Sequence, residues 1–142
     1  MAHVHISKLS LRIRGDTLVP EELTALLGAT PTFSYVKGEE VIINKAGRVR
    51  IADTGMWLLN VDDHSPENLD GQLHELFDRL TDDLDVWRKL DEDFSVDLFC
   101  GLFTQYLNEG FSISANVMQL IADRRLPIGF DIYGGKIVER PT

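Results

Sequence analysis

The chain has 142 residues, 44% of them apolar, and a formal net charge of −9. This length suits one domain of roughly 100–150 residues, and the apolar content is too high for a disordered chain. The single cysteine excludes a fold built on intramolecular disulfides. The sequence has no signal-peptide pattern and no apolar run long enough for a membrane span, so we expect a cytoplasmic protein.

The first half of the chain predicts three strand regions and a short helix. Leucine and isoleucine alternate with polar residues over 9–14, which predicts a half-buried strand. A proline followed by two glutamates opens a short helix over 20–28. Residues 31–40 are typical of a loop, 41–51 of a hairpin with a glycine in its turn, and 56–61 of a further strand.

The second half predicts one long helix and two strands separated by a shorter helix. Ser65 and Pro66 are a typical helix start, and leucines then recur at spacings of three and four as far as Trp87. We therefore expect a single helix across this segment. A strand over 95–103, a helix over 114–124 and a strand over 128–133 complete the chain.

This order of elements predicts an α+β fold in one domain, residues 1–142. We expect a split β-α-β (ferredoxin-like) sheet with helices mainly on one face, plus an inserted hairpin and an extra C-terminal helix-strand unit. The strand residues predicted to lie beneath the helices are Leu11, Ile13, Leu98, Phe130 and Ile132.

Short motifs are spread across the chain. They are Leu-Arg-Ile-Arg-Gly-Asp at 11–16, the proline-led helix at 20–28, Lys-Gly-Glu at 37–39, Trp57, Val-Asp-Leu-Phe-Cys-Gly-Leu-Phe at 96–103 and Phe-Asp-Ile-Tyr at 130–133. Together they resemble a bacterial family catalogued as domain of unknown function 4279. The chain departs from the pattern at Val19, where an aspartate cap usually precedes the proline. The resemblance implies a small stand-alone bacterial protein and carries over no catalytic residue.

Strand residues of the opposite parity form a mixed layer on the other face of the predicted sheet. They are Arg12, Arg14, Asp97, Phe99, Phe103, Asp131 and Tyr133. Arginine beside aromatic side chains is typical of protein interfaces, although cross-strand arginine–aspartate pairs also suit simple structural balance. Because large exposed aromatics are unfavourable, we expect a cover: more readily the hairpin at 37–53 or the loop at 104–111 than a second subunit in a homodimer.

An acidic segment dominates the net charge. Residues 62–97 contain 13 acidic and three basic side chains, a net of −10, while the remainder is close to neutral. Its densest part comprises Asp82, Asp83, Asp85, Asp91, Glu92 and Asp93. We expect these carboxylates at and beyond the C-terminal end of the long helix, where the helix dipole disfavours them. Such a field favours a basic protein partner over nucleic acid, although a solubilising face is the more ordinary reading.

Three other groups of residues have ordinary structural interpretations. His3 and His5 would share one side of a strand, as metal ligands require, but a frayed terminus is more typical. Asp70, His74 and Asp78 share one face of the predicted helix, which suits a solvated surface. Cys100 shares its strand face with leucines and predicts a buried, inert thiol. We expect no catalytic residue, no metal site and no cofactor.

Two hypotheses about function follow. The first is a non-enzymatic protein-binding domain with no nucleic-acid or membrane partner. Its narrower form is an immunity-type domain that neutralises a basic toxin. The second is a small-ligand sensor or enzyme that binds an anionic metabolite between the sheet and the hairpin. That pocket would be lined by Arg12, Arg14, Arg48, Arg50, Trp57 and Tyr133, although Trp57 is more typical of a core.

Overall fold

The computed structural model describes residues 2–134 and has a mixed α+β fold. A five-stranded sheet in the order β2-β5-β1-β6-β7 comprises β1 (Ile6–Gly15), β2 (Phe33–Tyr35), β5 (Gly55–Asn60), β6 (Ser95–Thr104) and β7 (Ile128–Gly134). A separate hairpin pairs β3 (Glu40–Ile42) with β4 (Val49–Ile51). The helices are α1 (Pro20–Leu27), α2 (Leu69–Arg79), α3 (Leu84–Asp93) and α4 (Ala115–Asp123).

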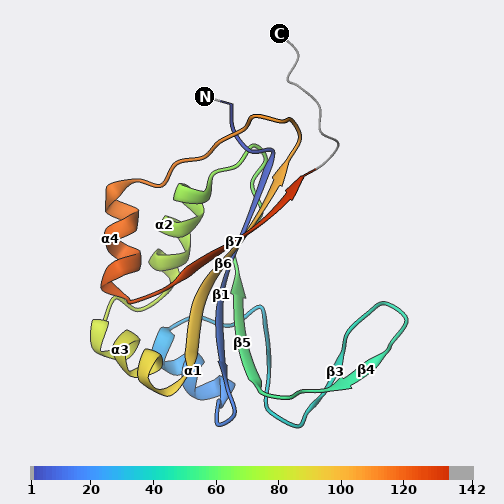
Figure 1. The fold of residues 1–142 in the computed structure, drawn as a ribbon. Coiled ribbons are helices and arrows are strands. Elements are labelled where there is room, and N and C mark those ends of the chain that lie inside the picture. The colour runs from blue at the N-terminus through green and yellow to red at the C-terminus, as the bar shows by residue number, and fades with distance from the viewer. Residues whose placement is uncertain (1, 135–142) are drawn as a thin grey trace.

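The four helices all lie on one side of the five-stranded sheet, and the β3–β4 hairpin projects away on the other side (Figure 1). The core lies between the sheet and these helices, where Leu11, Ile13, Trp57 and Leu98 are fully buried. The predicted α+β class and the placement of helices on one face are therefore confirmed.

The inserted hairpin, β3–β4, and the C-terminal helix-strand unit, α4–β7, are additions to a group of four antiparallel strands. β1 occupies the centre of the sheet and pairs antiparallel with both of its neighbours, β5 and β6. β2 is in turn antiparallel to β5, so each neighbouring pair in the order β2-β5-β1-β6 is antiparallel. The parallel pair among the described strands is instead β6–β7, which α4 connects as a crossover.

The prediction of one long helix is wrong, because the chain breaks between α2 and α3. Leu80 has an extended backbone, with φ −110° and ψ 158°, and the carboxylate of Asp83 caps α3 by accepting from the Asp85 amide at 3.0 Å. The apolar residues keep their spacing of three and four across the break, and Leu80 and Trp87 are both buried. The start also differs, since Asn68 caps α2 by accepting from the Gly71 amide.

The loop predicted at 31–40 contains a strand, β2. Phe33 and Tyr35 lie opposite Leu58 and Met56 of β5, at the edge of the sheet. Three residues are too few for an alternating pattern to stand out in the sequence. The strand matters for function because it places two aromatic side chains at the edge of the helix-free face.

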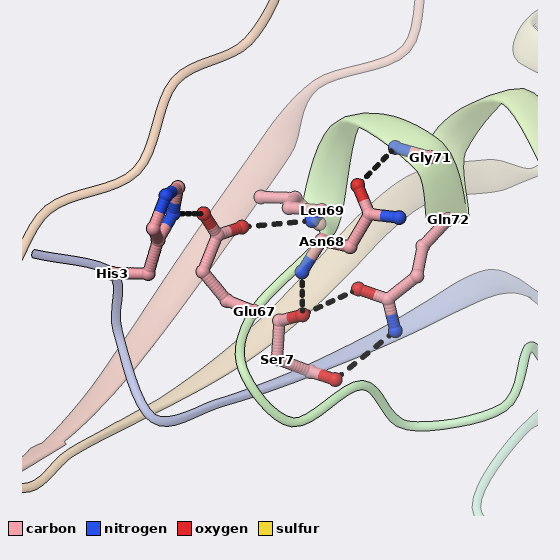
Figure 2. A network of polar contacts seen from close by, with 7 residues as sticks. All are labelled: His3, Ser7, Glu67, Asn68, Leu69, Gly71 and Gln72. Carbon is pink, nitrogen blue, oxygen red and sulfur yellow. Dashed lines mark hydrogen bonds and ion pairs between the residues drawn. The ribbon is translucent and has the colours of Figure 1, made fainter. Parts of the chain in front are cut away.

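A buried polar network joins the start of α2 to β1 (Figure 2). The Ser7 hydroxyl donates to Oε1 of Gln72 at 2.6 Å and accepts from the Asn68 amide at 3.1 Å. Nε2 of Gln72 donates to the carbonyls of Ser7 and Asp62 at 3.0 and 2.9 Å. Because Ser7 and Gln72 are both fully buried, this network fixes the position of α2 and leaves no accessible nucleophile.

The N-terminal segment is attached to the same region through Glu67 (Figure 2). Its carboxylate accepts from the Leu69 amide at 2.9 Å and lies 3.0 Å from Nδ1 of His3. His3 is therefore held against the start of α2 and does not fray, contrary to the sequence expectation. His5 is exposed.

The missing cap of α1 allows a stability prediction. Val19 has an extended backbone and makes no side-chain cap hydrogen bond. We expect Val19→Asp to stabilise the fold by about 1 kcal/mol, since its carboxylate can accept from a free amide of the first turn. Urea denaturation would measure the gain, with Val19→Ala as the control without a capping oxygen. Equal midpoints for the two variants would contradict the prediction.

Candidate functional site

The helix-free side of the sheet, called here the open face, carries side chains from all five strands. They are Lys8, Arg12, Arg14, Phe33, Tyr35, Met56, Leu58, Asp97, Phe99, Phe103, Asp131 and Tyr133. The register places Asp97 beside Arg12 and Tyr133 beside Phe103. The side-chain parity predicted for β1, β6 and β7 is therefore correct.

Arg12 is fixed at the centre of the open face. Its Nε and Nη2 donate to the two carboxylate oxygens of Asp97 at 2.9 and 2.6 Å, and its guanidinium lies 4.6 Å from the ring centroid of Phe99. The hydrogen bond to Asp97 raises the pKa of Arg12 above its usual value, although burial opposes the shift. Arg12 is thus a rigid, charge-balanced support for an aromatic ring.

A second ordered group lies at the β6–β7 end of the open face. The rings of Phe103 and Tyr133 stack with centroids 4.7 Å apart, and Nζ of Lys8 lies 5.6 Å from the Phe103 centroid. The Tyr133 hydroxyl donates to Asp131 at 3.2 Å, and this hydrogen bond raises the pKa of Tyr133. Tyr133 remains 49% exposed, so the stacked pair presents one side to solvent.

The expected cover over these aromatics is not provided by the hairpin. It projects from the sheet (Figure 1), and its aliphatic side chains are themselves exposed, by 70% for Ile42 and 54% for Ile51. The burial predicted for Phe130 and Ile132 is also wrong. Both share the helix side of the sheet but remain exposed, because β7 is an edge strand; Phe130 contacts only the ring of Phe111 among the described aromatic rings.

A cleft of about 280 Å³ lies between the open face and the base of the hairpin. Its lining residues are Arg14, Tyr35, Arg50, Asp53, Thr54 and Met56. Of the arginines predicted for such a pocket, Arg14 and Arg50 meet here, and neither forms an ion pair within residues 2–134. Tyr35 was missed from sequence because its segment was interpreted as a loop.

The other predicted pocket residues lie elsewhere. Trp57 is buried beneath the sheet, where its Nε1 donates to the Thr24 hydroxyl at 3.1 Å. Arg12 is engaged by Asp97, Tyr133 belongs to the stacked pair, and Arg48 is exposed on the hairpin.

A family model matches residues 5–135, which include nearly all of the structure just described. The chain belongs to the family described as Domain of unknown function (DUF4279). No curated protein and no solved structure matches the chain. The family resemblance predicted from the sequence motifs is thus confirmed. Any function proposed for this DUF4279 chain therefore rests on its own structure.

The acidic side chains of the DUF4279 chain occupy both ends of α3, which corrects the prediction that they follow one long helix. Asp83 caps the N-terminus of α3 and Asp85 lies in its first turn, where the helix dipole favours carboxylates. Asp91, Glu92 and Asp93 lie in the last turn, which contains no basic residue. There the dipole disfavours them. These five residues and Asp82 are all exposed.

The remaining sequence candidates of the DUF4279 chain have structural positions. Cys100 is fully buried, as predicted, and burial raises its pKa to about 12. His74 and Asp78 are exposed on α2, whereas Asp70 accepts from the Ser114 amide at 2.6 Å and attaches α4 to α2.

Residues 2–134 of the DUF4279 chain contain neither a group of metal ligands nor a helix able to span a membrane. No three histidine, cysteine or acidic side chains there are grouped as metal ligands. None of the helices in that range combines the length and apolar character needed to cross a bilayer.

Proposed function

We propose that this DUF4279 protein is a non-enzymatic binding domain that docks a basic protein on its open face. The observation that carries the proposal is the uncovered layer of aromatic rings ordered by cations. Phe33 and Tyr133 are 46% and 49% exposed at opposite edges of one sheet, with Phe99 and Phe103 between them. Aromatic and arginine side chains are the types enriched in the cores of protein interfaces.

The rings of the open face are held in place before any partner binds. Phe99 lies against Arg12, which Asp97 fixes through two hydrogen bonds, and Phe103 lies between Lys8 and Tyr133. Ordering side chains on binding costs roughly 0.5–1.5 kcal/mol for each one immobilised. A preordered layer reduces that cost, which supports a docking role for the open face.

The charge of the chain supports a basic partner. The last turn of α3 keeps three exposed carboxylates at the end where the dipole opposes them. A protein that tolerates such repulsion gains from a positively charged partner. Because α3 lies on the helix side of the sheet, its carboxylates would act on a partner at the open face through a long-range field, which salt weakens. In its narrower form the proposal is an immunity-type domain that neutralises a basic toxin.

The test is capture of a partner from a lysate of the source cells by three forms of the immobilised protein. We expect wild type and Met118→Ser to retain the same basic protein, and Tyr133→Ser to lose at least about tenfold of it, as for an interface hot spot. Met118 is the matched control because it is an equally exposed apolar residue on α4, on the helix side. If all three forms retain the basic protein, or if both variants lose it, the open face is not the docking site.

A measurement of mass in solution separates the partner proposal from self-association. If wild type is a dimer that Tyr133→Ser converts to a monomer, the open face joins two copies of this chain. That result would contradict docking of a different protein. We expect a monomer in both cases.

The acidic end of α3 gives a prediction in which stability and binding move in opposite directions. We expect Glu92→Lys to stabilise the fold by roughly 0.3–1 kcal/mol, since a cation suits the C-terminal end of a helix. The same change should reduce capture of the basic partner and its salt dependence. Asp62→Lys, at an exposed position between β5 and α2, is the control with equal change in charge. Urea denaturation and capture at two salt concentrations measure both effects; a destabilised variant with unchanged capture would contradict the prediction.

A second candidate function is recognition of an anionic small molecule in the cleft beside the hairpin. The observation that favours it is that Arg14, Arg50 and Tyr35 line one cleft and that neither arginine forms an ion pair within residues 2–134. Arginine forms paired hydrogen bonds with carboxylates and phosphates. A thermal-shift screen of anionic metabolites tests this function, since a ligand present at 100 times its dissociation constant adds about 2.7 kcal/mol to the free energy of unfolding.

The control for this screen is a comparison of two hairpin arginines. Arg50→Gln removes a residue that lines the cleft, whereas Arg48→Gln makes the same change of charge outside it. The stabilisation should be lost only in Arg50→Gln. No stabilisation of wild type by any anion in the screen would reject this function.

A further inference from the structure

Arg124 is a buried cation at the junction of three helices. It is the C-cap residue of α4, and only 6% of it is exposed. Its guanidinium lies 4.7 Å from the ring centroid of Phe77 on α2 and 5.9 Å from that of Trp87 on α3. Its burial could not be predicted from the sequence, because an arginine at the end of a helix is usually solvated.

The charge of Arg124 is incompletely satisfied. Nη1 donates to the Leu120 carbonyl at 3.1 Å, but Nε is buried without an acceptor, and no carboxylate in residues 2–134 forms an ion pair with this side chain. Burial lowers its pKa, although Asp123 and Asp82 act against that shift. A buried guanidinium normally has an anionic partner, since desolvation of a charge is costly.

Arg124 lines a cleft of about 190 Å³ between the start of α3 and the end of α4. The other lining residues are Leu84, Asp85, Arg88, Asp123 and Arg125. Three arginines and two aspartates thus line the cleft, and Nη2 of Arg88 lies 2.9 Å from Oδ1 of Asp85, whereas Arg124 and Arg125 form no ion pair within residues 2–134. The N-terminus of α3 adds a positive dipole. Arg125 has a positive φ of 55° because it ends α4, where the Leu126 amide donates to the Ile121 carbonyl at 3.2 Å.

We propose that this cleft is an oxyanion site, which binds one phosphate or carboxylate group of a small molecule between Arg88, Arg124 and Arg125. The anion would form the ion pair that Arg124 lacks within residues 2–134. The cleft is smaller than the roughly 300 Å³ at which whole-ligand pockets begin, so it fits a single charged group. It lies on the helix side of the sheet and is independent of the open face.

The test is an NMR titration of the 15N-labelled protein with inorganic phosphate and, separately, with acetate at constant ionic strength. We expect saturable shifts confined to the amides of 84–88 and 123–126 with at least one of the two anions. The anion that binds more tightly identifies the chemical class of the ligand. Shifts confined to Arg14, Arg50 and their neighbours would place anion binding in the other cleft and overturn the proposal, as would the absence of saturable shifts with both anions.

Variants of exposed arginines test the assignment without disturbing the core. Arg88→Gln should weaken binding about tenfold, the loss expected from one charge-assisted hydrogen bond. Arg48→Gln, which makes the same change in net charge on the hairpin, should leave the affinity unchanged. Equal affinities in the two variants would overturn the proposal. Arg124→Met removes the buried charge itself, and its spectrum shows first whether the fold is retained.

Discussion

Gln72→Leu is expected to destabilise the fold by about 2–4 kcal/mol, because leucine keeps the shape of the side chain but none of its three hydrogen bonds. The Asp62 carbonyl and the Ser7 hydroxyl would then lose their hydrogen bonds to the side chain of residue 72. Each unsatisfied buried group costs roughly 1–3 kcal/mol. Urea denaturation monitored by tryptophan fluorescence and circular dichroism gives the change in the free energy of unfolding.

Gln119→Leu is the matched control for this substitution. Gln119 also lies on a helix and donates to Asp123 at 2.7 Å, but it is exposed. Its replacement should cost less than about 0.5 kcal/mol. If the two variants have similar free energies of unfolding, the buried network does not hold α2 against β1 as the structure indicates.

The Cys100 thiol is expected to react with a disulfide reagent about a thousand times more slowly at pH 8 than an exposed thiol. Burial raises its pKa from 9.0 to about 12, so only about one molecule in ten thousand carries the reactive thiolate. Reaction should therefore follow opening of the fold and accelerate with urea. The control is Cys100→Ala with Ser95→Cys, which moves the thiol to an exposed position at the start of β6. Similar reaction rates would contradict burial.

The raised pKa of Cys100 also predicts a loss of stability in alkali. The native state holds the thiol proton more tightly than the unfolded state, so this contribution is complete below pH 9 and is lost as pH rises towards 12. Within that window the slope is up to about 1.4 kcal/mol per pH unit. Cys100→Ala should lack this part of the decline, as measured by urea denaturation at several pH values. A decline identical in both proteins would contradict the assignment.

The parts of the fold that sequence predicted are those in which a repeated pattern reports burial. Alternation in β1 and β6 assigned Leu11 and Leu98 to the core side and Arg12 and Phe99 to the other. The same rule failed for Ile132, because parity identifies a face but not whether a strand lies at the edge. The helix break was hidden for a related reason: the leucine period continues through Leu80, which is buried outside either helix.

The candidate sites depended on contacts that no local pattern contains. The parity of three strands was enough to assemble the arginine–aromatic layer, but β2 is too short to be predicted, so Phe33 and Tyr35 were missed. A pocket beside the hairpin was predicted from the sequence, but which of its four predicted arginines line the cleft depends on how β1 and β4 lie in the fold. The burial of Arg124 arises only when α2, α3 and α4 meet, and sequence gives no signal of that kind.

The central position of β1 has a consequence for synthesis of the protein. This strand is made first, yet one of its two partners is β6, and the Arg12–Asp97 pair closes a separation of 85 residues. Contacts so distant in sequence slow folding. A nascent chain therefore leaves the ribosome with one backbone edge of β1 unpaired until β6 has emerged, and such an edge can pair with other chains. Chains that terminate before residue 95 are expected to aggregate.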